Sequence, residues 1–213
     1  MNYFDEFEFK IPSQLRAIKS IETIVQSLEE LSQSRDLTTI TTRELSDRSG
    51  YALGTIFHHF KKFDDIFVYL FLMRRRKSLL KLVDVINKYP TEQPLSVLAS
   101  ITVNHFIHEL SKPNRQALLF VMSHFLRRTK HPERFSIEGD LLISAWMSAS
   151  QRDKTNTIYT FSENELRLRI RAVQAIIRSP FFENDPIAGT AEHKEIAFNL
   201  FMRLFIAPDL VEL

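Results

Sequence analysis

The twenty residues that begin at Thr41, TTRELSDRSGYALGTIFHHF, constrain the fold more than any other part of the sequence. Thr41 and Glu44 have the spacing of a capping box, in which each side chain satisfies a backbone N–H at a helix start. Gly50 lies where a helix ends in a left-handed residue, a conformation that glycine adopts without steric cost. Ile56 and Phe60, one turn apart, give a second helix a buried face. The segment therefore predicts two short helices joined by a tight turn.

Two short helices joined by a glycine turn are the geometry that places a recognition helix in the major groove of DNA. The same geometry also occurs at corners of all-helical proteins that never contact DNA. Spacing alone leaves both interpretations open, and residue identities are needed to choose between them.

The residue identities match a known pattern in each part of this segment. The matching residues are, in the first helix, Thr41, Thr42, Arg43, Glu44 and Leu45; in the turn, Gly50; in the second helix, Thr55, Ile56, Phe57, His59 and Phe60; and after it, Asp64, Asp65 and Ile66. With these residues the chain resembles the DNA-binding signature of the TetR family of transcriptional regulators, over about residues 13 to 72.

The resemblance implies an all-α fold of about nine helices, with an N-terminal three-helix helix-turn-helix domain and a C-terminal helical ligand-binding and dimerisation domain. The domains are expected at residues 1–62, including an N-terminal arm, and at 63–213. The implied protein is a homodimeric transcriptional regulator, a repressor released from a palindromic double-stranded DNA operator by a small-molecule effector. The residues expected to bind DNA are Thr41, Thr42, Arg43, Tyr51, Ala52, Leu53, Gly54, Thr55, Phe57, His58, His59, Lys61 and Lys62. Among them, Tyr51 and Leu53 are candidates for apolar contact with thymine methyl groups.

Three positions depart from the family pattern. Phe57 lacks the tyrosine hydroxyl that could bond a phosphate, and Phe63 replaces a lysine aimed at the DNA backbone. Lys61 and Lys62 are candidates to take the role of that lysine. Ala52 replaces the usual polar cap and leaves a helix N–H to meet a phosphate or water. Phe57 and Phe63 support an alternative hypothesis, a helical dimeric interaction module with weakened or lost DNA binding.

The composition agrees with a helical globular chain in which any DNA-binding charge is local. Hydrophobic residues make up 44% and charged residues 25% of the 213 residues, which is ordinary for a globular protein. Glycine is scarce, with 4 residues, and long stretches have the periodicity of helices. The net charge is only +2, so a nucleic-acid footprint has to be a patch.

The sequence predicts a cytoplasmic protein without a membrane span. The chain has 0 cysteines, which excludes disulfides and thiolate metal sites. Its first residues, MNYFDEFEF, are acidic, unlike the basic start of a signal peptide. No apolar run reaches the roughly 18 residues that a membrane helix needs.

Proline and hydrophobic periodicity set the remaining helix boundaries. A first helix starts near Ser13, and a candidate capping box at Ser162 opens a helix that is expected to stop before Pro180. The other expected helices span about residues 64–88, 95–110, 114–128, 132–150 and 191–206.

The last helix suggests a subunit interface. In its sequence IAFNLFMRLFI, only Asn199 and Arg203 are polar. An apolar arc this wide favours burial against the chain's own core on one side and a partner subunit on the other, although a central helix of a monomer is the alternative. In the TetR family the last two helices form a four-helix interface with their twofold mates. The resemblance therefore implies a homodimer interface of Leu166, Ile170, Val173, Ile177, Leu200, Phe201, Leu204 and Phe205.

Ligand chemistry is less well specified than DNA binding. The resemblance implies an effector pocket after about residue 63, with an apolar or aromatic ligand, and core packing is the alternative role for each candidate. The candidates to line it are His105, Phe106, His108, Phe120 and Trp146. His105 and His108 lack zincin spacing and a recognisable third ligand, so no metal is expected. The sequence has no glycine-rich phosphate loop and no nucleophile elbow, so neither a cofactor nor an enzyme is expected.

Overall fold

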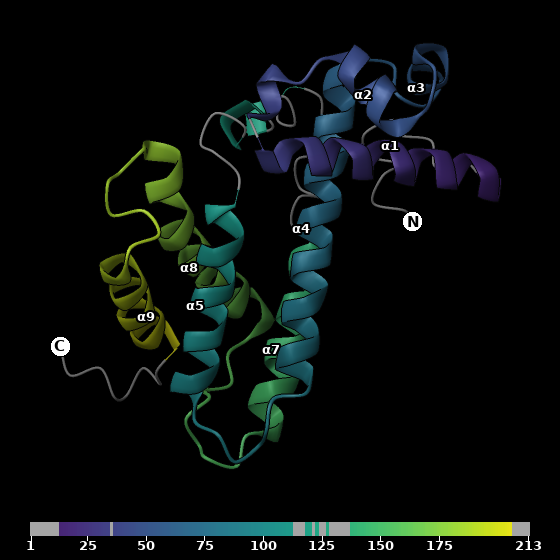
Figure 1. Cartoon of the computed structure of the whole chain (residues 1–213). Coiled ribbons are helices and arrows are strands. Elements are labelled where there is room, and N and C mark those ends of the chain that lie inside the picture. Colours follow the sequence, from purple (N-terminus) through teal and green to yellow (C-terminus); the bar gives the residue numbers. More distant parts are fainter. Residues whose placement is uncertain are drawn as a thin grey trace. The chain divides into compact units, whose positions relative to one another are not determined.

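A computed structural model describes residues 13–34, 36–112, 118–120, 122–123, 127 and 137–205. All regular structure in these residues is helical, and the chain divides into two compact units (Figure 1). The first unit comprises residues 1–76 and 116–132, and the second comprises 77–115 and 133–213. The helix expected at 114–128 lies largely outside the described residues.

The first unit is built around the helix-turn-helix corner. Its elements are α1 (Leu15–Ser34), the 3₁₀ turn η2 (Leu37–Thr39), α2 (Thr42–Ser49), α3 (Leu53–His59) and the beginning of α4 (Phe63–Asn87). Each α-helix contributes an aliphatic side chain that is completely buried, and these side chains are Ile24, Leu28, Leu45, Ile56, Ile66 and Leu72. The corner is thus fixed by apolar packing on its inner side.

Two ion pairs join α1 to the helices around it. Arg48 of α2 donates from Nε and Nη2 to Glu30 Oε2, at 3.0 and 2.5 Å. Arg74 of α4 donates to Glu29 Oε1 at 2.9 Å and to Ser32 Oγ at 3.1 Å. The hydrogen bond from Arg48 lowers the pKa of the Glu30 carboxyl. The Arg48 guanidinium therefore holds α2 against α1.

The second unit contains the aromatic core. It comprises the rest of α4 with α5 (Leu95–Ser111), α7 (Ile137–Arg152), α8 (Glu163–Glu183) and α9 (Ala191–Phe205), and α9 packs against both α5 and α8 (Figure 1). The Trp146 ring lies 5.6 Å from the Phe201 ring and 5.1 Å from the Phe205 ring. Phe201 and Phe205 stack with centroids 4.5 Å apart. Some of the phenylalanine side chains of the sequence are thus packed in this core.

The connection between α7 and α8 is organised by one carboxylate. Asp153 accepts hydrogen bonds from the backbone N–H groups of Thr155, Thr157 and Ile158, at 2.8 to 2.9 Å, and from the Thr155 hydroxyl. Burial raises the pKa of Asp153, but these hydrogen bonds outweigh burial and hold the pKa below its usual value. Thr157 Oγ1 in turn accepts from the Leu95 N–H at 2.8 Å, which ties this connection to the start of α5.

The sequence predicted that the helix opening at Ser162 stops before Pro180. This prediction is wrong, because α8 continues through Pro180 to Glu183. A proline has no N–H, so the carbonyl of Ile176, four residues earlier, loses its helical donor. His193 of α9 lies at that carbonyl, with Nε2 3.4 Å from the oxygen. Its Nδ1 accepts from the Gly189 N–H at 3.1 Å, which leaves Nε2 as the donor in the neutral ring. The helix instead ends at Asn184, in the left-handed conformation with φ 60°.

Because His193 takes the place of a helical backbone donor at the Ile176 carbonyl, substitutions at His193 and Pro180 are expected to have coupled effects on stability. His193→Ala leaves two half-buried backbone groups without these partners and is expected to lower the free energy of unfolding by about 1–3 kcal/mol. In a Pro180→Ala background the alanine N–H can serve the Ile176 carbonyl, so the cost of His193→Ala falls by about 1 kcal/mol. Denaturant unfolding of the two single variants, the double variant and the parent measures this difference, with exposed Lys194→Ala as control. Strictly additive costs would contradict the role of His193.

Candidate nucleic-acid interface

The predicted capping box at the start of α2 is confirmed. The Glu44 N–H donates to Thr41 Oγ1 at 3.3 Å, and the Thr41 N–H donates to Glu44 Oε2 at 2.8 Å. The carboxylate of Glu44 is therefore used to begin the helix and lies near its positive end.

The turn between α2 and α3 has the left-handed residue that the sequence predicted. Gly50 has φ 72° and ψ 9°, and its N–H donates to the Ser46 carbonyl at 3.0 Å. The Ser46 hydroxyl donates to the Tyr51 carbonyl at 2.7 Å, which fixes the residue after the turn. Sequence reasoning missed Ser46, because a serine inside a helix resembles any exposed polar position.

Helix α3 is held by two buried side chains, Ile56 within the helix and Phe60 as the residue that ends it. Ile56 is completely buried and Phe60 is 1% exposed. The Phe60 ring meets the Tyr69 ring edge to face at 5.6 Å. Ala52 precedes the helix without a side-chain cap, and its carbonyl accepts from the N–H groups of Thr55 and Ile56. These contacts leave the opposite face of α3 as the outer surface of the corner.

The outer face of α3 carries two large apolar side chains. Leu53 is 41% exposed and Phe57 is 42% exposed. Gly54 is exposed beside them, and a Cβ built on it meets nothing within 4 Å. His58 is exposed, whereas His59 is half-buried. Burial, and then the neighbouring His58, lower the pKa of His59.

Exposed cations precede and follow α3 in the sequence. Arg43 of α2 and Lys61 and Lys62 after α3 are exposed, as is one acidic neighbour, Asp47. The backbone of Lys62 is anchored, because its N–H donates to Asp65 Oδ2 at 3.0 Å at the start of α4. The other predicted contact residues are exposed or half-buried on the same corner: Thr41, Thr42, Tyr51, Ala52 and Thr55.

The packing around Phe63 explains why the chain has no lysine at that position. Phe63 is half-buried at the first residue of α4, and its ring meets the Phe67 ring edge to face at 5.0 Å. The Phe67 ring also lies 5.8 Å from the ring of Phe120. Position 63 therefore belongs to an aromatic cluster of the first unit.

The residues predicted to line an effector pocket belong to both units and differ in burial. Trp146 is 2% exposed within the core of the second unit, Phe106 packs against that core, and His108 is exposed. Phe120 lies in the first unit. His105 Nε2 lies 2.8 Å from Ser78 Oγ, and burial is the main cause of its lowered pKa.

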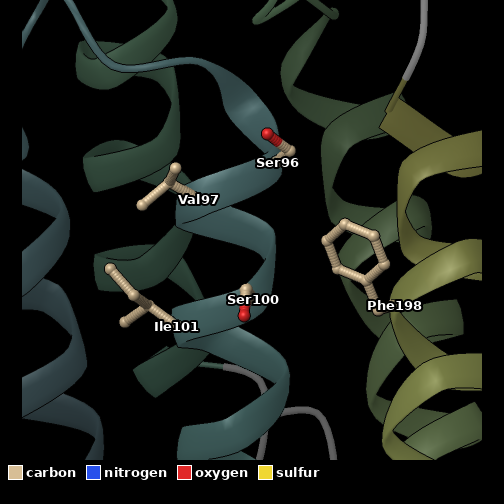
Figure 2. A pocket seen from close by; sticks show the side chains of 5 residues that line it. All are labelled: Ser96, Val97, Ser100, Ile101 and Phe198. Carbon is tan, nitrogen blue, oxygen red and sulfur yellow. The ribbon is translucent and has the colours of Figure 1, made fainter.

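The second unit has a hollow that lies on its surface. It is an open groove of about 350 Å³ between α5 and α9, in which Phe198 points from α9 toward α5 (Figure 2). The residues that line it are Ser96, Val97, Ser100, Ile101 and Phe198. None of the five predicted effector residues is among them.

Most of the residues predicted for a dimer interface lie in the chain's own core. The buried ones are Leu166, Ile170, Val173, Ile177, Phe201 and Phe205, whereas Leu200 and Leu204 are half-buried. The apolar arc of α9 is covered largely by α5 and α8. The large apolar side chains that α8 and α9 leave exposed are Leu168, at 65%, and Ile196, at 42%.

Neither metal ligands nor membrane helices are found in the described part of the chain. No three of its histidine, aspartate or glutamate side chains are grouped so that they could hold a metal ion. Among the helices that the structure describes, none has both the length and the apolar character needed to cross a bilayer.

A solved structure has the same arrangement of helices. A transcriptional regulator from Rhodococcus sp. Rha1 superposes with a TM-score of 0.52 and 17% identity, over 87% of this chain and 95% of that chain. The chain has the fold of this regulator. The all-helical fold class expected from the sequence is thus confirmed for the described residues.

Two other solved structures are more distant, and no match was found by sequence. A putative TetR family transcription regulator from Shewanella sp. PV-4 has a TM-score of 0.46 and 15% identity, over 88% of this chain and 98% of that chain. A TetR transcriptional regulator from Rhodococcus sp. RHA1 has a TM-score of 0.43 and 16% identity, over 88% and 96%. No protein-family model and no curated protein matches the sequence.

The two glycines of the corner are expected to respond oppositely to alanine. Gly50→Ala places a Cβ in a left-handed residue and lowers the free energy of unfolding by about 1–2 kcal/mol, whereas Gly50→Asn costs less. Gly54→Ala lies in a helix with open space around it and raises stability by about 0.5–1 kcal/mol. Thermal and urea unfolding rank the three variants by their free energy of unfolding. Equal effects of alanine at both positions would contradict the assigned turn.

Proposed function

We propose that the chain is a TetR-like, DNA-binding transcriptional regulator whose first 62 residues bind the operator. The observation that carries the proposal is the corner itself. A capped helix and a left-handed glycine lead into a short second helix that exposes two apolar side chains. Exposed cations precede and follow this helix in the sequence. This is the geometry in which a second helix enters the major groove while the first helix crosses the backbone.

In the proposed complex, charge and side-chain shape have different roles. Arg43, Lys61 and Lys62 neutralise phosphates and so position the protein on the DNA. These phosphate contacts carry no sequence information. The exposed side chains of α3 then meet base edges, with His58 as a hydrogen-bonding group among apolar neighbours.

The proposal includes a homodimer, because two recognition helices one DNA turn apart read a palindromic site. The supporting features are the family resemblance and the exposed Leu168 and Ile196 on the last two helices. The six buried candidates stabilise the subunit rather than the interface. The contacts with the partner subunit are thus expected on the outer faces of α8 and α9.

The proposal also includes release of the operator by a small molecule bound in the second unit, in the role of a repressor. An effector acts only if it binds the DNA-free arrangement more tightly than the DNA-bound one. The expectation of an apolar or aromatic ligand is unchanged. Its test is a screen of aromatic and aliphatic compounds for loss of a half-saturated protein–DNA complex.

The proposal predicts salt-dependent binding to duplexes selected from the host genome. Lys61→Glu combined with Lys62→Glu removes two phosphate contacts, so the slope of log affinity against log salt becomes shallower by about 2. Fluorescence anisotropy at several salt concentrations measures the slope, and the stoichiometry should be two chains per selected duplex. Lys194→Glu, an exposed site in the second unit, is the single-charge control and should leave the slope unchanged.

Two results would reject the proposal. If no fragment of the genome binds in a salt-dependent way, the interaction module without DNA binding becomes the better hypothesis. If the Lys194 variant changes the slope as much per charge as the corner variants do, DNA binding is a property of net charge and not of the corner.

A further inference from the structure

We propose that Ser46, on α2, is a positioning residue for DNA binding, because the hydrogen bond from its hydroxyl to the Tyr51 carbonyl holds the beginning of α3 in place. This inference rests on the proposed function. It assigns a role in that function to a side chain inside α2 that is not among the expected DNA contacts.

The first argument is that α3 begins without support from its own residues. Ala52 precedes the helix and makes no side-chain cap, whereas serine, threonine, aspartate or asparagine at this position would bond an N–H of the first turn. Ala52, Leu53 and Gly54 are all exposed. The two buried side chains, Ile56 and Phe60, come later in the helix and at its end. The N-terminal end of α3 is therefore not anchored by a buried side chain of its own.

The second argument is that the glycine turn leaves the direction of α3 open. Gly50 is left-handed, with φ 72°, and nothing lies within 4 Å of a Cβ built on it. Glycine has more accessible backbone conformations than any other residue, so this position permits the turn without dictating it. A further interaction is needed to select one path of the backbone into α3.

Ser46 supplies that interaction from α2, with two of its groups. Its backbone carbonyl accepts from the Gly50 N–H at 3.0 Å, and its hydroxyl donates to the Tyr51 carbonyl at 2.7 Å. Tyr51 leads directly to Ala52, whose carbonyl accepts the first hydrogen bonds of α3. Ser46 thus holds two of the three residues that connect the helices, and the third begins the hydrogen bonding of α3.

The position of this end of α3 matters for the proposed function. In helix-turn-helix proteins the N-terminal residues of the second helix contact base edges, while phosphate contacts position the protein. A small rotation of this end changes the fit to one base sequence but leaves the charge that attracts phosphates as it is. Loss of the Ser46 hydroxyl is thus expected to reduce the preference for one sequence, and not DNA binding in general.

Ser49 offers a matched control in the same turn. Its hydroxyl lies 3.4 Å from the Ser46 carbonyl and accepts from the Tyr51 N–H at 3.4 Å. Both distances exceed the usual range of roughly 2.5–3.2 Å, so these hydrogen bonds are weak. Both serines are half-buried. The two serines therefore differ mainly in the strength of their hydrogen bonds.

The experiment measures the affinity of the full-length chain for a duplex selected from a random pool and for a shuffled duplex of the same composition. Ser46→Ala is expected to weaken binding to the selected duplex about fivefold and to leave the shuffled duplex unchanged, since one neutral hydrogen bond is lost. Ser46→Thr keeps the hydroxyl and should keep the parent's ratio of the two affinities. Ser46→Val has the shape of threonine without the hydroxyl and should lose that ratio, so this pair decides even if the alanine variant folds poorly.

The ratio of affinities separates positioning from loss of structure. A variant that is merely less stable lowers the folded fraction and weakens binding to both duplexes equally, so its ratio stays that of the parent. Ser49→Ala should also keep the parent's ratio.

The parent's ratio in Ser46→Ala or Ser46→Val overturns the inference, as does an equal loss of the ratio in Ser49→Ala. In these cases the parent still binds its selected duplex in a salt-dependent way, so the proposed function stands. If the parent selects no duplex at all, the proposed function fails, and the role of Ser46 fails with it.

Discussion

The anchoring of α3 by Ile56 and Phe60 is the interaction on which the corner depends. With 7 residues, α3 is too short to be stable as an isolated helix, so packing has to supply its stability. The same two contacts decide which side faces outward, because a helix that buries one stripe must expose the other. Gly54 and His58 lie farthest from Ile56 and are exposed, and the exposed Leu53 and Phe57 lie at the edge of the same face.

The turn at Gly50 is the second feature on which the corner depends. A left-handed residue with φ 72° brings α3 back across α2 within a few residues. The capping box at Thr41 fixes where α2 begins, and the Ser46 hydroxyl fixes the chain just after the turn. Local hydrogen bonds thus determine the path of the backbone, and apolar burial determines its orientation.

The parts of the structure that could be predicted from the sequence are those with local signals. The capping box, the left-handed glycine and the buried Ile56 each depend on residues within one or two helical turns, so spacing reveals them. The continuation of α8 through Pro180 depends on His193, a residue from the next helix, which no local rule includes. The apolar stripe of α8 was recognised, but a stripe does not say whether it faces its own chain or a partner. The structure places Leu166, Ile170, Val173 and Ile177 in the core of the second unit.

The most direct test of the account is a photochemical cross-link between α3 and a base. A selected duplex is synthesised with iodouracil at a thymine position, so that iodine replaces the methyl group, and is irradiated in complex with the chain. Digestion and mass spectrometry then locate the cross-linked residue. The account predicts a cross-link to Phe57, and loss of that cross-link in the Phe57→Ala variant. Cross-links only to residues outside 41–62 would contradict the assignment of α3 as the helix that contacts DNA.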